Sequence, residues 1–172
     1  MEYRLIIGTD YVALSDYYLR NEQGFKIWQP KLAYDFHYKE NWKKRISEQL
    51  DEQNSGNAYY FVAEKKGIVY GHCTLSQVSR GVFQACYLGF SVCKSYEGKG
   101  IAFNLVKHAC DYAFGTVKLN RIMAAHIPHN NRSARLLKRV GFKRDGFARN
   151  YLKINGNWEN HILCSLQAAD CC

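Results

Sequence analysis

A short glycine-bearing stretch, residues 95–102 (SYEGKGIA), is the part of the sequence best suited to binding chemistry. An apolar run at 85–92 precedes it and apolar residues at helical spacing follow it, so it joins a buried strand to a helix start. The first N–H groups of a helix lack internal partners and carry partial positive charge. Gly98 and Gly100 would let a ligand approach these amides, and Lys99 adds a full charge. The stretch predicts phosphate or pyrophosphate binding, although glycines between a strand and a helix also form ordinary turns.

Other familiar ligand-binding patterns are not found in the sequence. The lysine-hydroxyl pair of a Walker loop does not follow the last glycine, and the three spaced glycines of the dinucleotide fingerprint are lacking. No cysteine or histidine pair has zinc spacing, so we expect no metal site.

The seven cysteines are expected to be reduced. Their number is odd, and most of them lie inside apolar runs, where cysteine behaves as a small buried hydrophobe. The terminal Cys171-Cys172 pair does not form a prenylation box, which needs a cysteine fourth from the end, and we interpret it as an ordinary tail.

Composition predicts one globular domain spanning residues 1–172. The hydrophobic fraction is 47% and no apolar run has the length of a membrane helix or signal peptide, so we expect a cytoplasmic protein. The net charge of +9 favours polyanionic partners such as nucleic acid, ribosomes or phosphate-bearing cofactors. The same charge is equally compatible with a solvated basic surface.

Hydrophobic periodicity places these residues on a mixed α/β framework. Helices are expected at 11–21 (with Asp10 as N-cap), 41–53, from about 102 onward, and 132–140. Strands are expected at 4–7, 59–64, 68–75, 85–92, 121–126, 143–154 and 158–166. Asn155-Gly156 predicts a type I′ turn between the last two strands, and residues 24–39 are irregular and rich in aromatic side chains.

The order of these signals resembles the GCN5-related N-acetyltransferase superfamily. Its glycine motif, R/Q-x-x-G-x-G/A, is matched by Gly98 and Gly100, while Ser95 stands where the motif prefers Arg or Gln. The segments CYLGFSV, YEGKGIAFNLV, NRIMAAHIPHNNRSARLLKRVGF and YLKINGNWENH closely resemble ribosomal-protein-alanine N-acetyltransferases of the RimJ type. The resemblance implies an α+β fold, with a mostly antiparallel mixed sheet splayed between its fourth and fifth strands and flanked by helices.

The resemblance also implies a site for acetyl-CoA within that splay. The backbone of Phe90, Ser91 and Val92 would hold the pantetheine arm like an added strand. Asn130 stands where the family has an asparagine that contacts this arm. The amides that would cradle the pyrophosphate are those of Glu97, Gly98, Lys99, Gly100, Ile101 and Ala102.

The implied reaction is direct transfer of an acetyl group from a thioester to an amine. An N-terminal amine, with a pKa of about 7.7–8.0, needs little help from a base. Ala125 stands where some relatives carry a catalytic glutamate, so the neighbouring His126 is the candidate base, or else a structural histidine. Leu137 replaces a tyrosine acid used by many members. Ser133 matches a serine that related enzymes use to protonate the leaving thiolate, unless it merely caps its helix.

Three functions follow from this resemblance. The first is acetylation of the N-terminal alanine of a small-subunit ribosomal protein. The second keeps the chemistry but uses a small amine, such as a polyamine, aminoglycoside or amino acid, although the basic surface repels polycations. The third is a ribosome-assembly or RNA-binding factor with secondary acetyltransferase activity. The aromatic residues at 25–38 are expected to border the acceptor groove or to form ordinary core.

Overall fold

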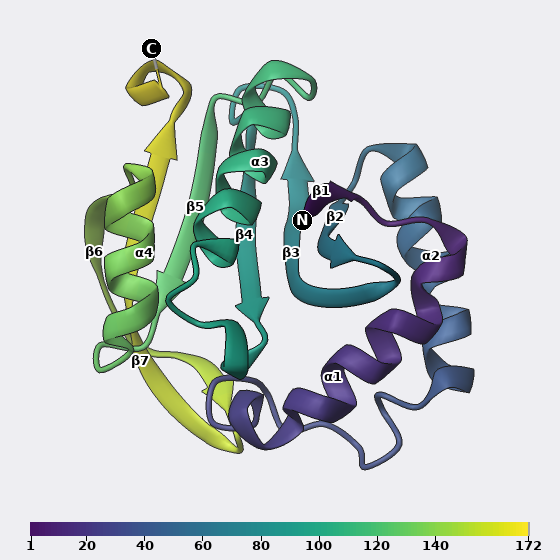
Figure 1. Ribbon diagram of the computed structural model, residues 1–172. Helices are drawn as coiled ribbons and strands as arrows, with labels where there is room; N and C mark the ends of the chain where they lie inside the picture. The colour runs from purple at the N-terminus through teal and green to yellow at the C-terminus, as the bar shows by residue number, and fades with distance from the viewer. Residues whose placement is uncertain (172) are drawn as a thin grey trace.

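The computed structural model describes residues 1–171, which form a seven-stranded sheet with helices on both faces (Figure 1). The strands are β1 (Glu2–Leu5), β2 (Tyr59–Lys65), β3 (Ile68–Ser79), β4 (Ala85–Val92), β5 (Arg121–His126), β6 (Lys143–Ile154) and β7 (Asn157–Gln167). The main helices are α1 (Tyr11–Phe25), α2 (Lys39–Ser55), α3 (Ile101–Gly115) and α4 (Asn131–Val140). Cys172, the last residue of the tail interpreted from the sequence as ordinary, lies outside the described residues.

The sheet is antiparallel except where β4 runs beside β5. Its order is β1-β2-β3-β4-β5-β7-β6, and α3 connects the parallel pair. Pairing between β4 and β5 covers only Ala85–Tyr87 and Arg121–Met123. The two strands then continue to Val92 and His126 and diverge, as Figure 1 shows. The predicted fold class, with a splay between the fourth and fifth strands, is confirmed.

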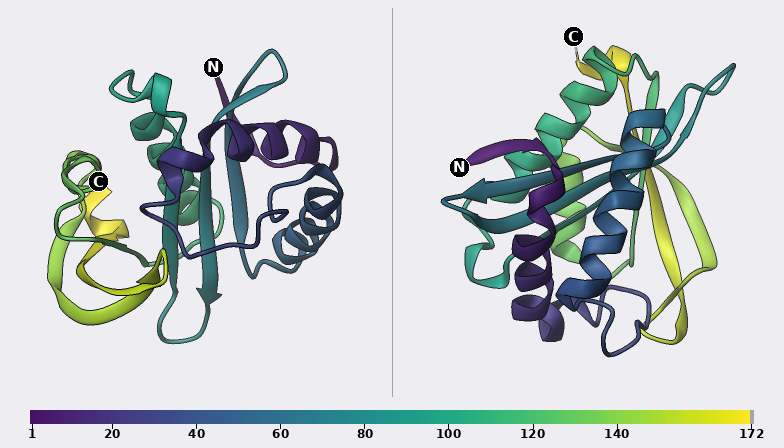
Figure 2. Two further views of the ribbon diagram at one scale, coloured as in Figure 1. Left: turned by 90° about the horizontal axis from the view of Figure 1, so that it is seen from below. Right: turned by 90° about the vertical axis from the view of Figure 1, so that its right-hand side faces the viewer.

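Each face of the sheet is covered by its own pair of helices. We call the side packed by α3 and α4 the α3 face; there Leu105 and Leu137 cluster with Ile122 of β5. We call the opposite side the α1 face; there Tyr17 and Trp42 cluster with strand residues of β2 and β3. Figure 2 shows α1 and α2 side by side, away from α3 and α4. Because strand side chains alternate between faces, the register decides which functional side chains share a face.

Local sequence explains why these elements form. The apolar positions of α3 recur at helical spacing and most of them are buried, namely Ile101, Leu105, Val106, Ala109, Cys110 and Ala113. Between β6 and β7, Asn155 (φ 46°) and Gly156 (φ 90°) are both left-handed, as the predicted type I′ turn requires. Five cysteines are free and buried, as expected: Cys73, Cys86, Cys93, Cys110 and Cys164.

The predicted cap and the predicted bounds of the first strand are wrong. Asp10 occupies the position before α1, but its carboxylate accepts from the Arg4 guanidinium at 2.7 Å and from the Ile7 amide instead of capping the helix. The first strand is Glu2–Leu5 rather than 4–7, because it pairs with the end of β2 opposite Phe61 to Glu64. Among the helices of residues 1–171, none is long and apolar enough to cross a membrane.

Candidate active site

The glycine-bearing stretch forms an open loop that leads into α3. Gly98 (φ 74°) and Gly100 (φ 80°) are both left-handed, a conformation that favours glycine. Gly100 directly precedes the helix, and no side chain caps it. In the loop, the amides of Glu97 and Lys99 donate to the Lys94 and Tyr96 carbonyls at 3.3 and 3.4 Å. In the helix, the Asn104 amide donates to the Gly100 carbonyl at 3.0 Å. The preceding amides at the helix start are therefore available to an anion.

Charged and aromatic side chains surround this loop. The Lys99 ammonium lies 4.3 Å from the centre of the Tyr96 ring. The Tyr96 ring in turn packs against Tyr70, with ring centres 4.5 Å apart. Glu97 forms an ion pair with Arg132, which lies at the start of α4. A side chain of the loop thus meets a side chain from the start of α4.

The part of β4 beyond its contact with β5 has one open edge. Phe90, Ser91 and Val92 pair with β3 on one side, and within the described residues they have no strand on the other side. On the α1 face, the buried Tyr17 hydroxyl donates to the Ser91 hydroxyl at 2.9 Å. Burial raises the pKa of Tyr17 well above its usual range, so this hydroxyl keeps its proton. Helix α1 therefore braces the strand whose edge is open.

The start of α4 is capped by Asn130. Its side-chain oxygen accepts from the Ser133 amide at 3.2 Å, and its own amide donates to the Ile127 carbonyl at 2.9 Å. Ser133 is the third residue of the helix and is half-buried. The alternative that Ser133 caps this helix is therefore wrong, and its hydroxyl is left for another role.

Two histidines lie at the end of the splay on opposite faces of the sheet. His126 of β5 alternates with Ile122 and Ala124, which are in the α3-face core, so it shares that face with α4. His161 of β7 is one residue out of phase with Ile162, the partner of His126, and lies on the α1 face. In each, Nδ1 lies 3.0 Å from a backbone carbonyl, that of Ile127 or Glu159 respectively. Such a bond makes Nδ1 the donor and leaves Nε2 as the acceptor.

Comparison with known proteins assigns this arrangement to a family. Residues 4–143 match the family model described as an acetyltransferase (GNAT) domain. The chain belongs to the GNAT acetyltransferase family. Enzymes of this family use acetyl-CoA as the acetyl donor. The resemblance derived from the glycine motif and the segments around it is confirmed.

Three relatives of this GNAT acetyltransferase carry more specific names. The [ribosomal protein uS5]-alanine N-acetyltransferase of Escherichia coli (strain K12) is 38% identical over 97% of this chain and 87% of its own length. The crystal structure of ribosomal-protein-S5-alanine acetyltransferase from Vibrio fischeri has a TM-score of 0.94 at 38% identity, covering 98% of this chain and 93% of that one. Mycobacterium smegmatis RimJ in complex with CoA-disulfide has a TM-score of 0.92 at 29% identity, covering 98% and 82%.

The irregular segment between α1 and α2 reaches both the start of α4 and the β6–β7 turn. The Trp28 and His129 ring centres are 5.7 Å apart, and the Gln29 carbonyl accepts from the Asn155 amide at 2.9 Å. Phe25 is buried, whereas Tyr34 is 84% exposed. The prediction that the aromatic side chains at 25–38 form ordinary core is therefore confirmed for Phe25 and wrong for Tyr34.

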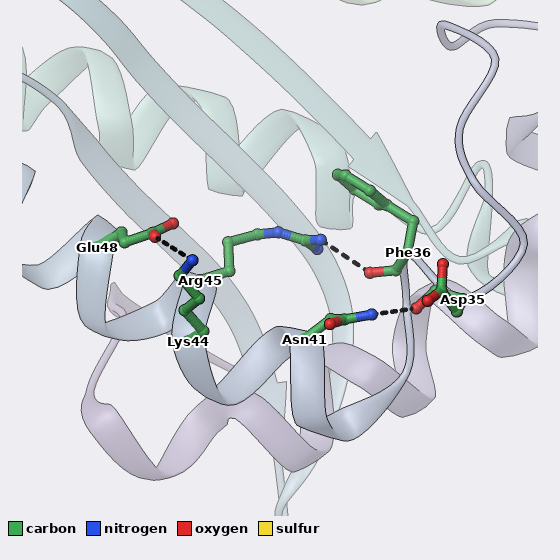
Figure 3. A pocket seen from close by; sticks show the side chains of 6 residues that line it. All are labelled: Asp35, Phe36, Asn41, Lys44, Arg45 and Glu48. Atoms are coloured by element: carbon green, nitrogen blue, oxygen red, sulfur yellow. Dashed lines mark hydrogen bonds and ion pairs between the residues drawn. The ribbon is translucent and has the colours of Figure 1, made fainter.

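The other end of this segment is fixed to α2 around a small surface pocket (Figure 3). There the Arg45 guanidinium donates to the Phe36 carbonyl, and the Asn41 side chain donates to the Asp35 carbonyl, each at 2.8 Å. Arg45 also lies 3.7 Å from the centre of the Phe36 ring. The segment is thus held at one end by the start of α4 and the β6–β7 turn, and at the other end by α2.

Structure brings most of the sequence-predicted site residues to one place, the mouth of the splay. The glycine loop, the open edge of β4 and the start of α4 all border it. Sequence reasoning missed the ion pair between Glu97 and Arg132 and the bond between Tyr17 and Ser91, whose partners lie 35 and 74 residues apart. Within residues 1–171, no group of three or more metal-ligating side chains gathers.

Proposed function

We propose that this GNAT acetyltransferase transfers the acetyl group of acetyl-CoA to the N-terminal alanine of ribosomal protein uS5. The observation that carries the proposal is the 38% identity, over 97% of the chain, to an enzyme named for that reaction. Motif order supports it, because the segments that border the splay are those that resemble the same enzymes. An enzyme with this substrate would meet it in the cytoplasm, in or near the small ribosomal subunit.

The residues present fit acetyl-CoA as the acetyl donor. Of the amides of residues 97–102, those of Glu97 and Lys99 donate to backbone carbonyls, and the others, at the start of α3, suit a pyrophosphate because they lie at the positive end of a 15-residue helix. The open edge of Phe90, Ser91 and Val92 suits an amide-containing pantetheine arm, which would pair with it as a strand does. The Asn130 side chain uses its oxygen for the helix cap, which leaves its NH₂ group to donate to the arm.

Acetyl-CoA would supply the thioester. Two proton transfers remain for side chains of the protein, one to the departing sulfur and one from the attacking amine. Ser133 would give its proton to the departing sulfur, since its hydroxyl is not the helix cap. His126 would receive the proton of the attacking amine through Nε2, because its Nδ1 donates to the Ile127 carbonyl. About a tenth of N-terminal amines are neutral at pH 7, so the contribution of the base is expected to be small.

Small polyamines are the second candidate class of acceptor. Acetylation of a polyamine would use the same glycine motif. A chain of net charge +9 repels a polycation, however, whereas it attracts the RNA to which a ribosomal protein is bound. The same charge would support ribosome or RNA binding alongside catalysis. We therefore expect a peptide acceptor to be used far more efficiently than spermidine.

The decisive test uses peptides of about ten residues that match the N-terminus of uS5. Incubation with acetyl-CoA followed by peptide mass spectrometry should show one acetyl group on the alanine amine. A peptide with the same sequence and a blocked N-terminus is the control for lysine acetylation. Equal labelling of both peptides, or efficient acetylation of spermidine only, would contradict the proposal.

The assigned proton carriers are tested by matched variants. We expect Ser133→Ala to lower kcat about a hundredfold with unchanged CoA affinity. His126→Asn should lower kcat about tenfold or less, and His161→Asn is its control, since that histidine makes the same type of bond on the other face. A larger loss of kcat in the His161 variant would move the base to the α1 face.

A further inference from the structure

An ion pair joins the starts of two helices at the mouth of the splay. Glu97 belongs to the loop before α3, and Arg132 is the second residue of α4. Their side chains are 35% and 62% exposed. Exposed pairs of this kind contribute little to folding stability, so the pair can be separated at small cost.

Arg132 occupies an unfavourable position for a cation. The start of a helix carries partial positive charge, and arginine stabilises the opposite end. The first turn of α4 holds no acidic residue, and neither does the first turn of α3. Glu97 is therefore the negative group that offsets Arg132, and it comes from the loop that leads into the other helix. If the start of α4 were arranged for stability alone, we would expect an acidic residue within its own first turn.

This carboxylate pairs with the Arg132 guanidinium. The loop that carries it also contains Lys99 and leads directly into the open amides at the start of α3. A phosphate group carries more charge than a carboxylate and accepts two parallel hydrogen bonds from a guanidinium. This site therefore suits a phosphate better than it suits Glu97.

We propose that Glu97 is a stand-in for a phosphate of CoA, and that Arg132 exchanges one for the other when CoA binds. The inference rests on the proposed function, which supplies the ligand. On binding, Arg132 releases the Glu97 carboxylate and donates to a phosphate, while Glu97 turns to solvent. CoA offers two sources for this phosphate, its pyrophosphate and its 3′-phosphate. In the free protein, Glu97 competes with the ligand.

The proposal predicts opposite effects for the two halves of one ion pair. Arg132→Gln should weaken CoA binding about tenfold, as expected for one charge-assisted contact. Glu97→Gln should tighten CoA binding about threefold, because it removes both a competitor and a like charge. A purely structural ion pair would instead give weaker or unchanged binding in both variants.

Calorimetric titration of CoA into the protein, at low and at physiological salt, measures these effects without catalysis. Asp111→Asn is the control for Glu97, since Asp111 forms an exposed ion pair with Lys107 further along α3. Lys138→Gln, in the last turn of α4, controls for the net charge removed with Arg132. Unchanged thermal melting of all four variants would show that each is folded.

Dephospho-CoA, which lacks the 3′-phosphate, identifies the phosphate. If Arg132→Gln weakens CoA but not dephospho-CoA, the partner is the 3′-phosphate; equal weakening of both assigns the pyrophosphate. Either result supports the exchange, provided that Glu97→Gln tightens binding. If the wild type binds CoA and acetylates the uS5 peptide while both variants match their controls, the exchange is overturned and the function stands. If the wild type does not bind CoA, both are overturned.

Discussion

On the α3 face of the sheet, α3 and α4 contribute aliphatic and small side chains to the core, whereas on the α1 face the core is aromatic and contains buried polar groups. Leu105, Val106 and Leu137 are typical of the first. Tyr17 and Trp42 are typical of the second. The two faces have similar coverage by helices but different chemistry.

Two histidines whose pKa values are lowered lie on the α1 face. His72 is buried, and its Nδ1 lies 2.8 Å from the Tyr18 hydroxyl, while its Nε2 has no partner among the described residues. Burial lowers the pKa of His72 to about 4. Burial, together with the nearby Arg45, lowers the pKa of His37 to about 4 as well, and the His37 ring stacks on Tyr18. The α1 face is therefore more stable while His72 and His37 are neutral than when they are protonated.

The largest expected effect is loss of core volume on the α3 face. Leu105 is fully buried, so Leu105→Ala should lower the free energy of unfolding by about 3–4 kcal/mol through lost burial and a residual cavity. Urea unfolding followed by circular dichroism measures this. The loss should be the same at pH 7 and pH 5. Leu19→Ala, at an exposed position of α1, should cost under about 0.5 kcal/mol.

Acid should destabilise the α1 face by nearly as much. The pKa of His72 is 6.5 in the unfolded chain and about 4 in the folded chain. Between these two values, His72 binds a proton in the unfolded chain but not in the folded one, which favours unfolding. Stability is therefore fully present above pH 6.5 and falls as the pH drops through this window. The contribution of His72 amounts to about 3 kcal/mol.

The His72→Asn variant tests this assignment. Asparagine can still accept from the Tyr18 hydroxyl, but it does not titrate. Its free energy of unfolding should depend less steeply on pH between 6.5 and 4 than that of the wild type. An unchanged pH dependence would show that the acid sensitivity does not come from His72.

A smaller effect is expected where the α1 face meets the open strand. Tyr17→Phe removes the bond to Ser91 and leaves a hydroxyl of β4 without its donor, which should cost about 1 kcal/mol. Because this bond braces the proposed pantetheine edge, CoA affinity should fall as well. Tyr34→Phe, at a highly exposed position, is the control for both measurements. Unchanged CoA affinity in Tyr17→Phe would limit the bond to a role in stability.

The smallest effect is expected at the surface of α2. Lys44 and Glu48 lie one helical turn apart with charged atoms at 3.8 Å, and both are mostly exposed (Figure 3). A double-mutant cycle of Lys44→Ala and Glu48→Ala should give a coupling of about 0.5 kcal/mol or less, which added salt removes. A coupling above 1 kcal/mol would show that surface charge contributes substantially to the stability of this layer.

Most of the fold could be predicted from the sequence because its signals are local. The α3 helix follows from apolar spacing, and the β6–β7 hairpin follows from Asn155-Gly156. Boundaries failed where distant partners decide them. The strand β3 extends to Ser79, beyond the predicted residue 75, because Ser79 pairs with Ala85 of β4. Asp10 failed as a cap because Arg4 offers its carboxylate a stronger, charged partner.

Some features of the candidate site could likewise be predicted from local sequence, whereas others depend on distant partners. The glycine loop and the turn before α4 could be located from sequence because backbone geometry at Gly98, Gly100 and Asn130 is locally encoded. Which face carries His126 could not be predicted, since that depends on its register with Ile162. The ion pair between Arg132 and Glu97 could not be predicted either, because the two residues lie 35 positions apart and are brought together by the packing of α3 against α4.

The short contact between β4 and β5 has a consequence for association between molecules. Beyond Ala85–Tyr87 and Arg121–Met123, the splay presents two strand edges inside the sheet, and no strand of residues 1–171 covers either edge. Such edges template the addition of foreign strands, and proteins usually guard them with charge, proline or a covering element. Here the guard would be the pantetheine arm itself. Protein without bound CoA should therefore aggregate most readily, and a ligand that fills the splay should stabilise the native sheet.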